Sequence, residues 1–145
     1  MTHSIPMACG FLGGTILSVE GGYRVLQHPH PERVFTRIAD ARWFLAVAWC
    51  DQSPTPAGIL NHDGQLTFQN QAVMAVGETA FLPLKHRKAV FNACLTLSPG
   101  EVTDYAIQSG SHSSGHQVEI LSLEVDPRYG RVAAVRAKPP DALQN

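Results

Sequence analysis

The sequence predicts an α+β domain in which an antiparallel sheet of about five strands is flanked by a few helices. Apolar and polar residues alternate in several short segments, turns rich in glycine separate those segments, and two longer stretches carry apolar residues at helical spacing. We assign residues 54–138 to this domain, residues 1–53 to an N-terminal extension with a hairpin and a helix, and residues 139–145 to a frayed tail.

Length and composition narrow the classes of protein to consider. The chain has 145 residues, 44% of them hydrophobic and 16% charged. A chain of this length and hydrophobic content can bury a core without the help of disulfides or bound metal ions. Eleven basic and twelve acidic residues leave no net field for nucleic acid or an anionic membrane. The longest apolar run, 43–50, is too short to span a bilayer, and we expect no signal peptide. Because Cys9, Cys50 and Cys94 are scattered, we expect reduced thiols and a cytoplasmic protein.

The start of the extension predicts an arm followed by a hairpin. Residues 1–10 hold a proline and small side chains, and we expect a loose arm there. Residues 11–26 predict a hairpin, because Gly21 and Gly22 can adopt the positive φ that a tight turn needs.

A helix is predicted from residue 31 to about residue 42. Pro31 fits the first helical position, where its missing N–H costs nothing. Residues 43–50 are apolar on every side, which suits either the end of a buried helix or a buried strand. The apolar residues that recur at helical spacing are Val34, Ile38, Ala41 and Leu45.

One stretch organises the domain. Asp63-Gly64 lies between two apolar segments, 57–60 and 65–69, and predicts a hairpin because glycine supplies a positive φ without steric cost. Asn70 then fits the N-cap of a short helix, since its side-chain oxygen can accept a backbone N–H of the first turn.

A further helix is predicted over residues 85–95, after Pro83 and before the stop at 98–100. Its apolar stripe consists of Ala89, Val90, Ala93, Cys94 and Leu97. We interpret the four basic residues at its start as a solvated face, because so short a cluster does not indicate nucleic-acid binding. These residues are Lys85, His86, Arg87 and Lys88.

Three strands are predicted to close the domain, at residues 102–108, 117–125 and 132–137. In the second of them the apolar residues change face between Ile120 and Leu121. That change predicts a bulge or a strand buried on both sides.

The elements around Asp63-Gly64 resemble the opening of PAS domains, whose first hairpin carries an Asp-Gly turn and ends on an asparagine followed by a helix of small residues. Residues 115–137 are similar to the long hairpin that ends a PAS sheet. The resemblance covers residues 54–138 and implies that both hairpins belong to one curved sheet with helices on one side. The matching residues are Gly58, Ile59, Leu60, Asp63, Gly64, Phe68, Asn70 and Ala72.

The resemblance implies sensing or binding rather than catalysis. A small apolar or aromatic ligand would lie between sheet and helices, or a protein partner would bind the sheet face. The residues that the resemblance places at such a cavity are Phe68, Asn70, Met74, Phe91 and Tyr105.

The resemblance also implies how the domain would pass on a signal. The chain carries no kinase, helix-turn-helix or cyclase segment, so we expect the output to pass through a signalling protein partner or through self-association. The helix before the hairpin fits a PAS N-terminal cap, where homodimers often form. Trp43, Phe44 and Trp49 are the candidates for that dimer contact, and an ordinary core role is the alternative.

The residues do not favour a bound flavin, haem or metal ion. Covalent flavin binding needs a cysteine directly after an asparagine, and here Ala93 separates Asn92 from Cys94. Haem-binding relatives carry a histidine inside the flanking helix, whereas His86 lies in the charged helix start. Two histidine pairs have metal-ligand spacing, but their proline-rich and serine-rich surroundings favour solvent-exposed side chains over a metal site. These pairs are His28 with His30 and His112 with His116.

Two other functions stay open on the sequence. One is a small β-rich enzyme that uses histidines with or without a metal. The other is a structural assembly subunit, favoured if the N-terminal arm exchanges between protomers.

Overall fold

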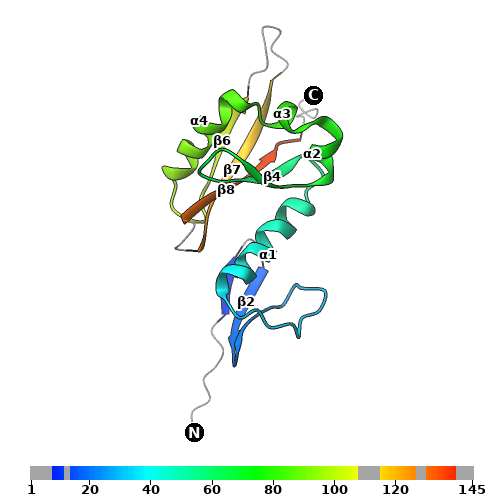
Figure 1. Cartoon of the computed structure of the whole chain (residues 1–145), viewed down its shortest axis with the longest axis vertical. Coiled ribbons are helices and arrows are strands. Elements are labelled where there is room, and N and C mark those ends of the chain that lie inside the picture. Colours follow the sequence, from blue (N-terminus) through cyan, green and yellow to red (C-terminus); the bar gives the residue numbers. More distant parts are fainter. Residues whose placement is uncertain (1–7, 12–13, 108–114, 127–129, 140–145) are drawn as a thin grey trace. The chain divides into compact units, whose positions relative to one another are not determined.

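The computed structural model describes residues 8–11, 14–107, 115–126 and 130–139. The chain divides into two compact units, residues 1–46 and 47–145. The boundary falls within the helix α1 (Ile38–Asp51), so each unit contains part of that helix (Figure 1). No helix in the described ranges has the length and apolar character needed to cross a membrane.

The first unit contains a three-stranded antiparallel sheet in the order β1-β2-β3. The strands are β1 (Ala8–Phe11), β2 (Gly14–Val19) and β3 (Gly22–Val25). The predicted hairpin is therefore present, and Gly21 and Gly22 have the expected positive φ, 89° and 151°. The prediction of a loose arm over residues 1–10 was wrong at its end, because Ala8–Phe11 pairs with β2 as a strand.

The predicted helix starts later than the sequence indicated. Phe35 exchanges two backbone hydrogen bonds with Tyr23, 2.7 and 2.8 Å long, and so extends the β-sheet by a bridge. This pairing keeps residues 33–36 out of a helix, so α1 begins at Ile38 instead of Pro31. The open assignment of residues 43–50 is resolved as helix. Val34, placed on the apolar stripe, is 41% exposed.

The second unit contains a five-stranded antiparallel sheet in the order β5-β4-β8-β7-β6. The Asp63-Gly64 hairpin and the closing ribbon therefore share one sheet, which confirms the predicted α+β, PAS-like class. The strands are β4 (Ala57–Leu60), β5 (Leu66–Gln69), β6 (Val102–Ile107), β7 (His116–Asp126) and β8 (Gly130–Ala137).

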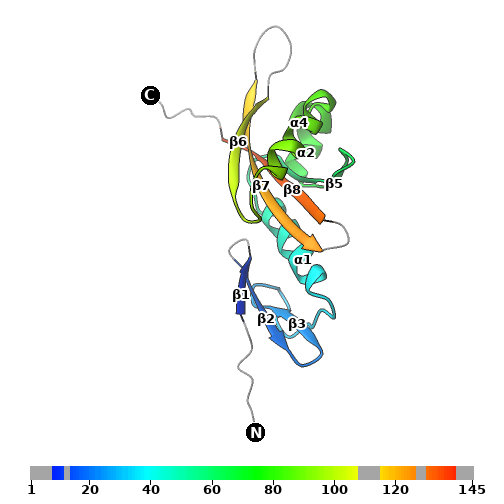
Figure 2. The ribbon, with the colours of Figure 1, turned by 90° about the vertical axis from the view of Figure 1, so that its left-hand side faces the viewer.

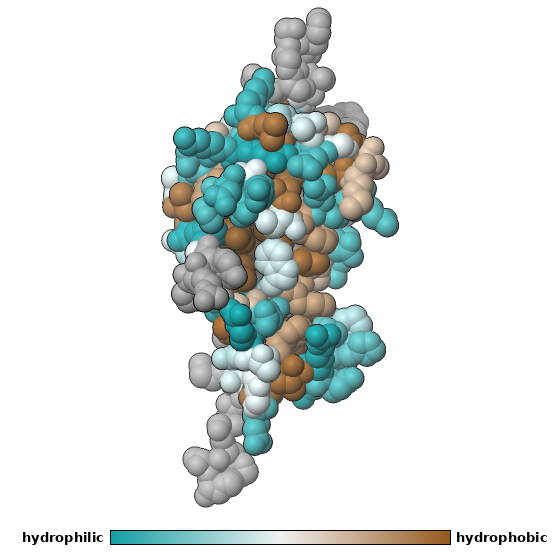
Figure 3. Space-filling view, in the orientation of Figure 1, coloured by the Kyte–Doolittle hydropathy of each residue, from teal (hydrophilic) through white to brown (hydrophobic). Residues whose placement is uncertain are grey.

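Three helices cover one face of this sheet (Figure 2). They are α2 (Gln71–Val76), α3 (Glu78–Phe81) and α4 (Leu84–Leu95). The predicted short helix after Asn70 and the predicted helix before residue 98 are both present. On the face drawn in Figure 3, apolar side chains lie interspersed with polar ones.

Strand β7 confirms one of the two alternatives that the change of face predicted, burial on both sides, while its pairing runs in register through that point. Its residues Ile120, Leu121, Ser122 and Leu123 are all buried, so both sides of the strand are covered there. The pairing of β7 with β8 also shifts register between Glu124 and Asp126. Residues 108–114, between β6 and β7, and residues 127–129, between β7 and β8, lie outside the described residues.

Candidate functional site

The five residues predicted to line a cavity do not come together. Phe91 is 8% exposed in the core beneath the helices, and Tyr105 packs against that core from β6. Met74 is 71% exposed, so it does not face the interior. Asn70 is 3% exposed and bonds backbone groups instead of lining a cavity.

Phe68 lies on the other face of the sheet. Gly58 faces the helices, since a Cβ built there would approach Phe81 at 3.7 Å. Neighbouring residues in a strand point to opposite faces, so Ile59 points away from the helices. Phe68 pairs directly with Ile59 and shares its face. The sequence did not reveal this because the pairing shifts by one residue between Ile59 and Leu60.

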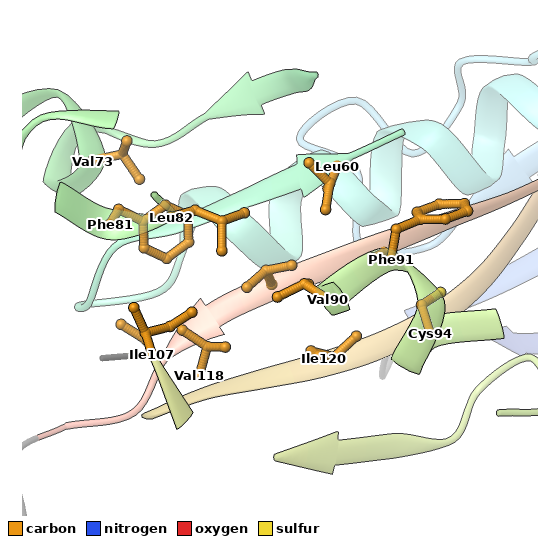
Figure 4. Packing of buried hydrophobic residues seen from close by; sticks show 13 residues of the cluster. Leu60, Val73, Phe81, Leu82, Val90, Phe91, Cys94, Ile107, Val118 and Ile120 are labelled. Carbon is orange, nitrogen blue, oxygen red and sulfur yellow. The ribbon is translucent and has the colours of Figure 1, made fainter. Parts of the chain in front are cut away.

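The space between helices and sheet is filled by apolar side chains. Phe81, Leu82, Val90 and Phe91 project from the helices towards the strands, and all are at most 8% exposed (Figure 4). Within the described residues no buried side-chain nitrogen or oxygen lacks a hydrogen-bond partner. The interior therefore offers contacts for an apolar molecule and has no spare polar group to orient a charged one. The buried cluster consists of Leu60, Val73, Phe81, Leu82, Val90, Phe91, Cys94, Ile107, Val118, Ile120, Ala133, Val135 and Ala137.

The basic start of α4 is not simply a solvated face, which corrects the sequence interpretation. His86 is half-buried, and its Nδ1 lies 3.1 Å from the Tyr105 hydroxyl with the two rings edge to face. Arg87 is 5% exposed. A signal for this existed, because Arg87, Val90 and Cys94 follow one another at helical spacing along the buried side of α4.

Arg87 connects three separate elements. Its Nε donates to the Leu82 carbonyl at 3.0 Å, and its guanidinium donates to the Gly64 carbonyl at 3.2 Å and to Glu78 Oε1 at 3.0 Å. The other Glu78 oxygen accepts a hydrogen bond from Gln69 at 2.9 Å. The hydrogen bonds from Arg87 and Gln69 lower the pKa of Glu78. The Asp-Gly turn, α3 and α4 are thus held together by one buried cation.

Asn70 links the end of α1 to the core of the second unit. Its side-chain amide donates to the carbonyls of Cys50 and Thr55, both at 3.0 Å. Its oxygen accepts from the backbone N–H groups of Ala57 and Val73, both at 3.1 Å. The predicted N-cap of α2 is therefore present. The same side chain also fastens α1 and β4, which local sequence could not indicate.

A second contact holds the end of α1 to the central strand β8. The Arg136 guanidinium lies 4.5 Å from the centre of the Trp49 ring, a cation–π geometry. Arg136 is also paired with Glu119 on β7. Beside it, burial raises the pKa of the Cys50 thiol to about 12, so this thiol stays protonated and unreactive.

The remaining candidate ligands are engaged in the fold. Cys94 is free and buried, as is Cys50, and burial raises the pKa of the Cys94 thiol. In the first unit the His28 ring accepts a hydrogen bond from the His30 backbone and stacks on Phe44 at 4.5 Å. No group of three metal-binding side chains gathers in the described part of the chain. His112 lies outside that part.

Comparison with solved structures returns a PAS domain. The chain resembles the PAS domain of an HTR-like protein from Haloarcula marismortui, with 16% sequence identity and a TM-score of 0.40. The match covers 68% of this chain and 91% of that one. No family model matches the sequence. No curated protein matches it either.

Proposed function

We propose that this chain is a PAS-like sensory and interaction module that has no catalysis of its own and acts through self-association. The observation that carries the proposal is the attachment of α1 to the core of the second unit. Asn70 binds the Cys50 carbonyl at the last turn of α1, and Arg136 covers Trp49. A change in the packing of the core can therefore be transmitted to α1 through these two contacts.

The small core of the first unit supports self-association. Its buried cluster in the described residues consists of Ile16, Val25, Ala41 and Leu45. So few buried side chains contribute little stability for a segment of this length. Trp43, on the same helix, is half-buried. We infer that a second copy of the chain adds apolar contacts at Trp43, which makes the chain a homodimer.

A bound ligand has less support than self-association. The side chains of Phe81, Leu82 and Phe91 occupy the place where a PAS-like cavity would lie. A small apolar or aromatic molecule would have to displace one of them. The free thiols of Cys50 and Cys94 fit a reducing compartment such as the cytoplasm.

Light scattering on the full chain after size exclusion tests the proposal. We expect a mass twice the 15.7 kDa of one chain at micromolar concentration. Trp43→Ala should shift the mass towards one chain without loss of helix signal. Trp49→Ala is the matched control, because its ring contacts Arg136, and it should lower stability while the dimer persists. A wild-type chain that stays at 15.7 kDa at all concentrations would overturn the proposal.

A further inference from the structure

The segment from Gln71 to Leu82, which we call the α2–α3 segment, depends on a few side chains for its order. It consists of two helices of six and four residues, too short to be stable on their own. Only Val73, Phe81 and Leu82 are buried within it. Because no strand pairing holds it, its position rests on these three anchors and on polar contacts at its ends.

A single glycine separates the two short helices. Gly77 ends α2 and precedes α3 with φ of 100°, a conformation that side chains other than glycine rarely adopt. No atom lies within 4 Å of the position that a Cβ would take there, so packing does not restrict the joint. Met74 and Val76, just before it, are 71% and 53% exposed.

Arg87 fastens the far end of this segment to α4. It donates to Glu78 in α3 and to the carbonyl of Leu82, while its third bond goes to Gly64 outside the segment. A guanidinium that is 5% exposed needs these acceptors, since an unpaired buried cation is costly. The ion pair with Glu78 is the part of the attachment that reaches solvent, because the Glu78 side chain is 42% exposed.

We propose that the α2–α3 segment is a lid that opens by a change of backbone conformation at Gly77, and that the Arg87–Glu78 ion pair is its latch. Opening withdraws Phe81 and Leu82 from the cluster that also holds Ile107 and Val118, and so gives access to the apolar interior (Figure 4). The proposal concerns the motion of one chain and does not depend on dimer formation.

Hydrogen exchange followed by mass spectrometry on the full chain tests the lid. Amides of residues 71–82 should exchange faster than those of β7 and β8, because they open without global unfolding. Glu78→Gln keeps the shape of the side chain and removes its charge. This change should speed exchange in residues 71–82 by about 1.5- to fivefold, the range expected for a partly exposed ion pair. Amides of β7 and β8, which open only on global unfolding, should remain slower to exchange than residues 71–82 in both proteins.

Asp104→Asn is the matched control, since Asp104 pairs with Lys138 at the same distance of 3.0 Å but outside the segment. It should leave exchange in residues 71–82 as in the wild type. Two results would overturn the proposal. One is exchange of residues 71–82 at the rate of the central strands, and the other is unchanged exchange of residues 71–82 in Glu78→Gln.

Discussion

Replacement of Asn70 with alanine removes the side chain that joins α1, β4 and α2. Asn70 is 3% exposed, so water does not readily replace its bonds. The Ala57 N–H loses its side-chain acceptor, which costs about 1–3 kcal/mol for a buried donor. The loss of the α2 N-cap costs about 1 kcal/mol, although the Val73 N–H keeps the Asn70 carbonyl as a partner.

The donor side of the same amide adds to this cost. The carbonyls of Cys50 and Thr55 each lose one hydrogen bond but keep another, from the Ser53 backbone and the Ser53 hydroxyl respectively. Because each carbonyl keeps a second donor, the loss of the bond from Asn70 costs about 0.5 kcal/mol of stability per carbonyl. Together these effects give an expected loss of about 3–5 kcal/mol in the free energy of unfolding.

Urea unfolding followed by circular dichroism measures this loss, with Asn61→Ala as the control. The Asn61 oxygen also accepts two backbone N–H groups, both at 2.9 Å, but in an exposed turn. Water can replace those bonds, so the control should lose about 1 kcal/mol or less. Asn70→Asp should lose at least as much as alanine, because its buried carboxylate would face the Cys50 and Thr55 carbonyl oxygens with no donor between them. An Asn70→Ala loss no larger than that of Asn61→Ala would refute the reasoning.

Two further changes follow from the burial and charge of single residues. Phe81→Ala should lower the free energy of unfolding by about 3–5 kcal/mol, because Phe81 is 2% exposed. Phe68→Ala should lower it by about half as much, because Phe68 is only half-buried. Equal urea midpoints for the two variants would place Phe68 in the core after all. Glu78 has a folded-state pKa below its ordinary 4.5, so it stabilises the fold above that pH and loses this effect as the pH falls through the folded pKa. The gap in urea midpoint between wild type and Glu78→Gln should therefore narrow below pH 4.5, and a constant gap would contradict the ion-pair assignment.

Much of the fold could be predicted because short stretches of sequence determine many of its turns and helix ends. The Asp63-Gly64 turn, the helix cap at Asn70 and the break before Gly100 depend on residues that are neighbours in the chain. The pairing of the two hairpins in one sheet was implied by the resemblance to PAS domains, and the strand order confirms it. The site was predicted less well, because its five candidates were carried over from the resemblance, without knowledge of which face of its element each side chain occupies.

The sequence by itself determined the turns, the caps and the periodic segments, since each is governed by contacts within a few residues. Only the tertiary structure decided where α1 begins, which face Phe68 occupies and that Arg87 is buried. Each of these depends on a partner distant in the chain: Tyr23 for the residues before α1, Ile59 for Phe68, and Gly64 for Arg87. Burial and pairing between distant residues override local preference because they change free energy by more than propensity does.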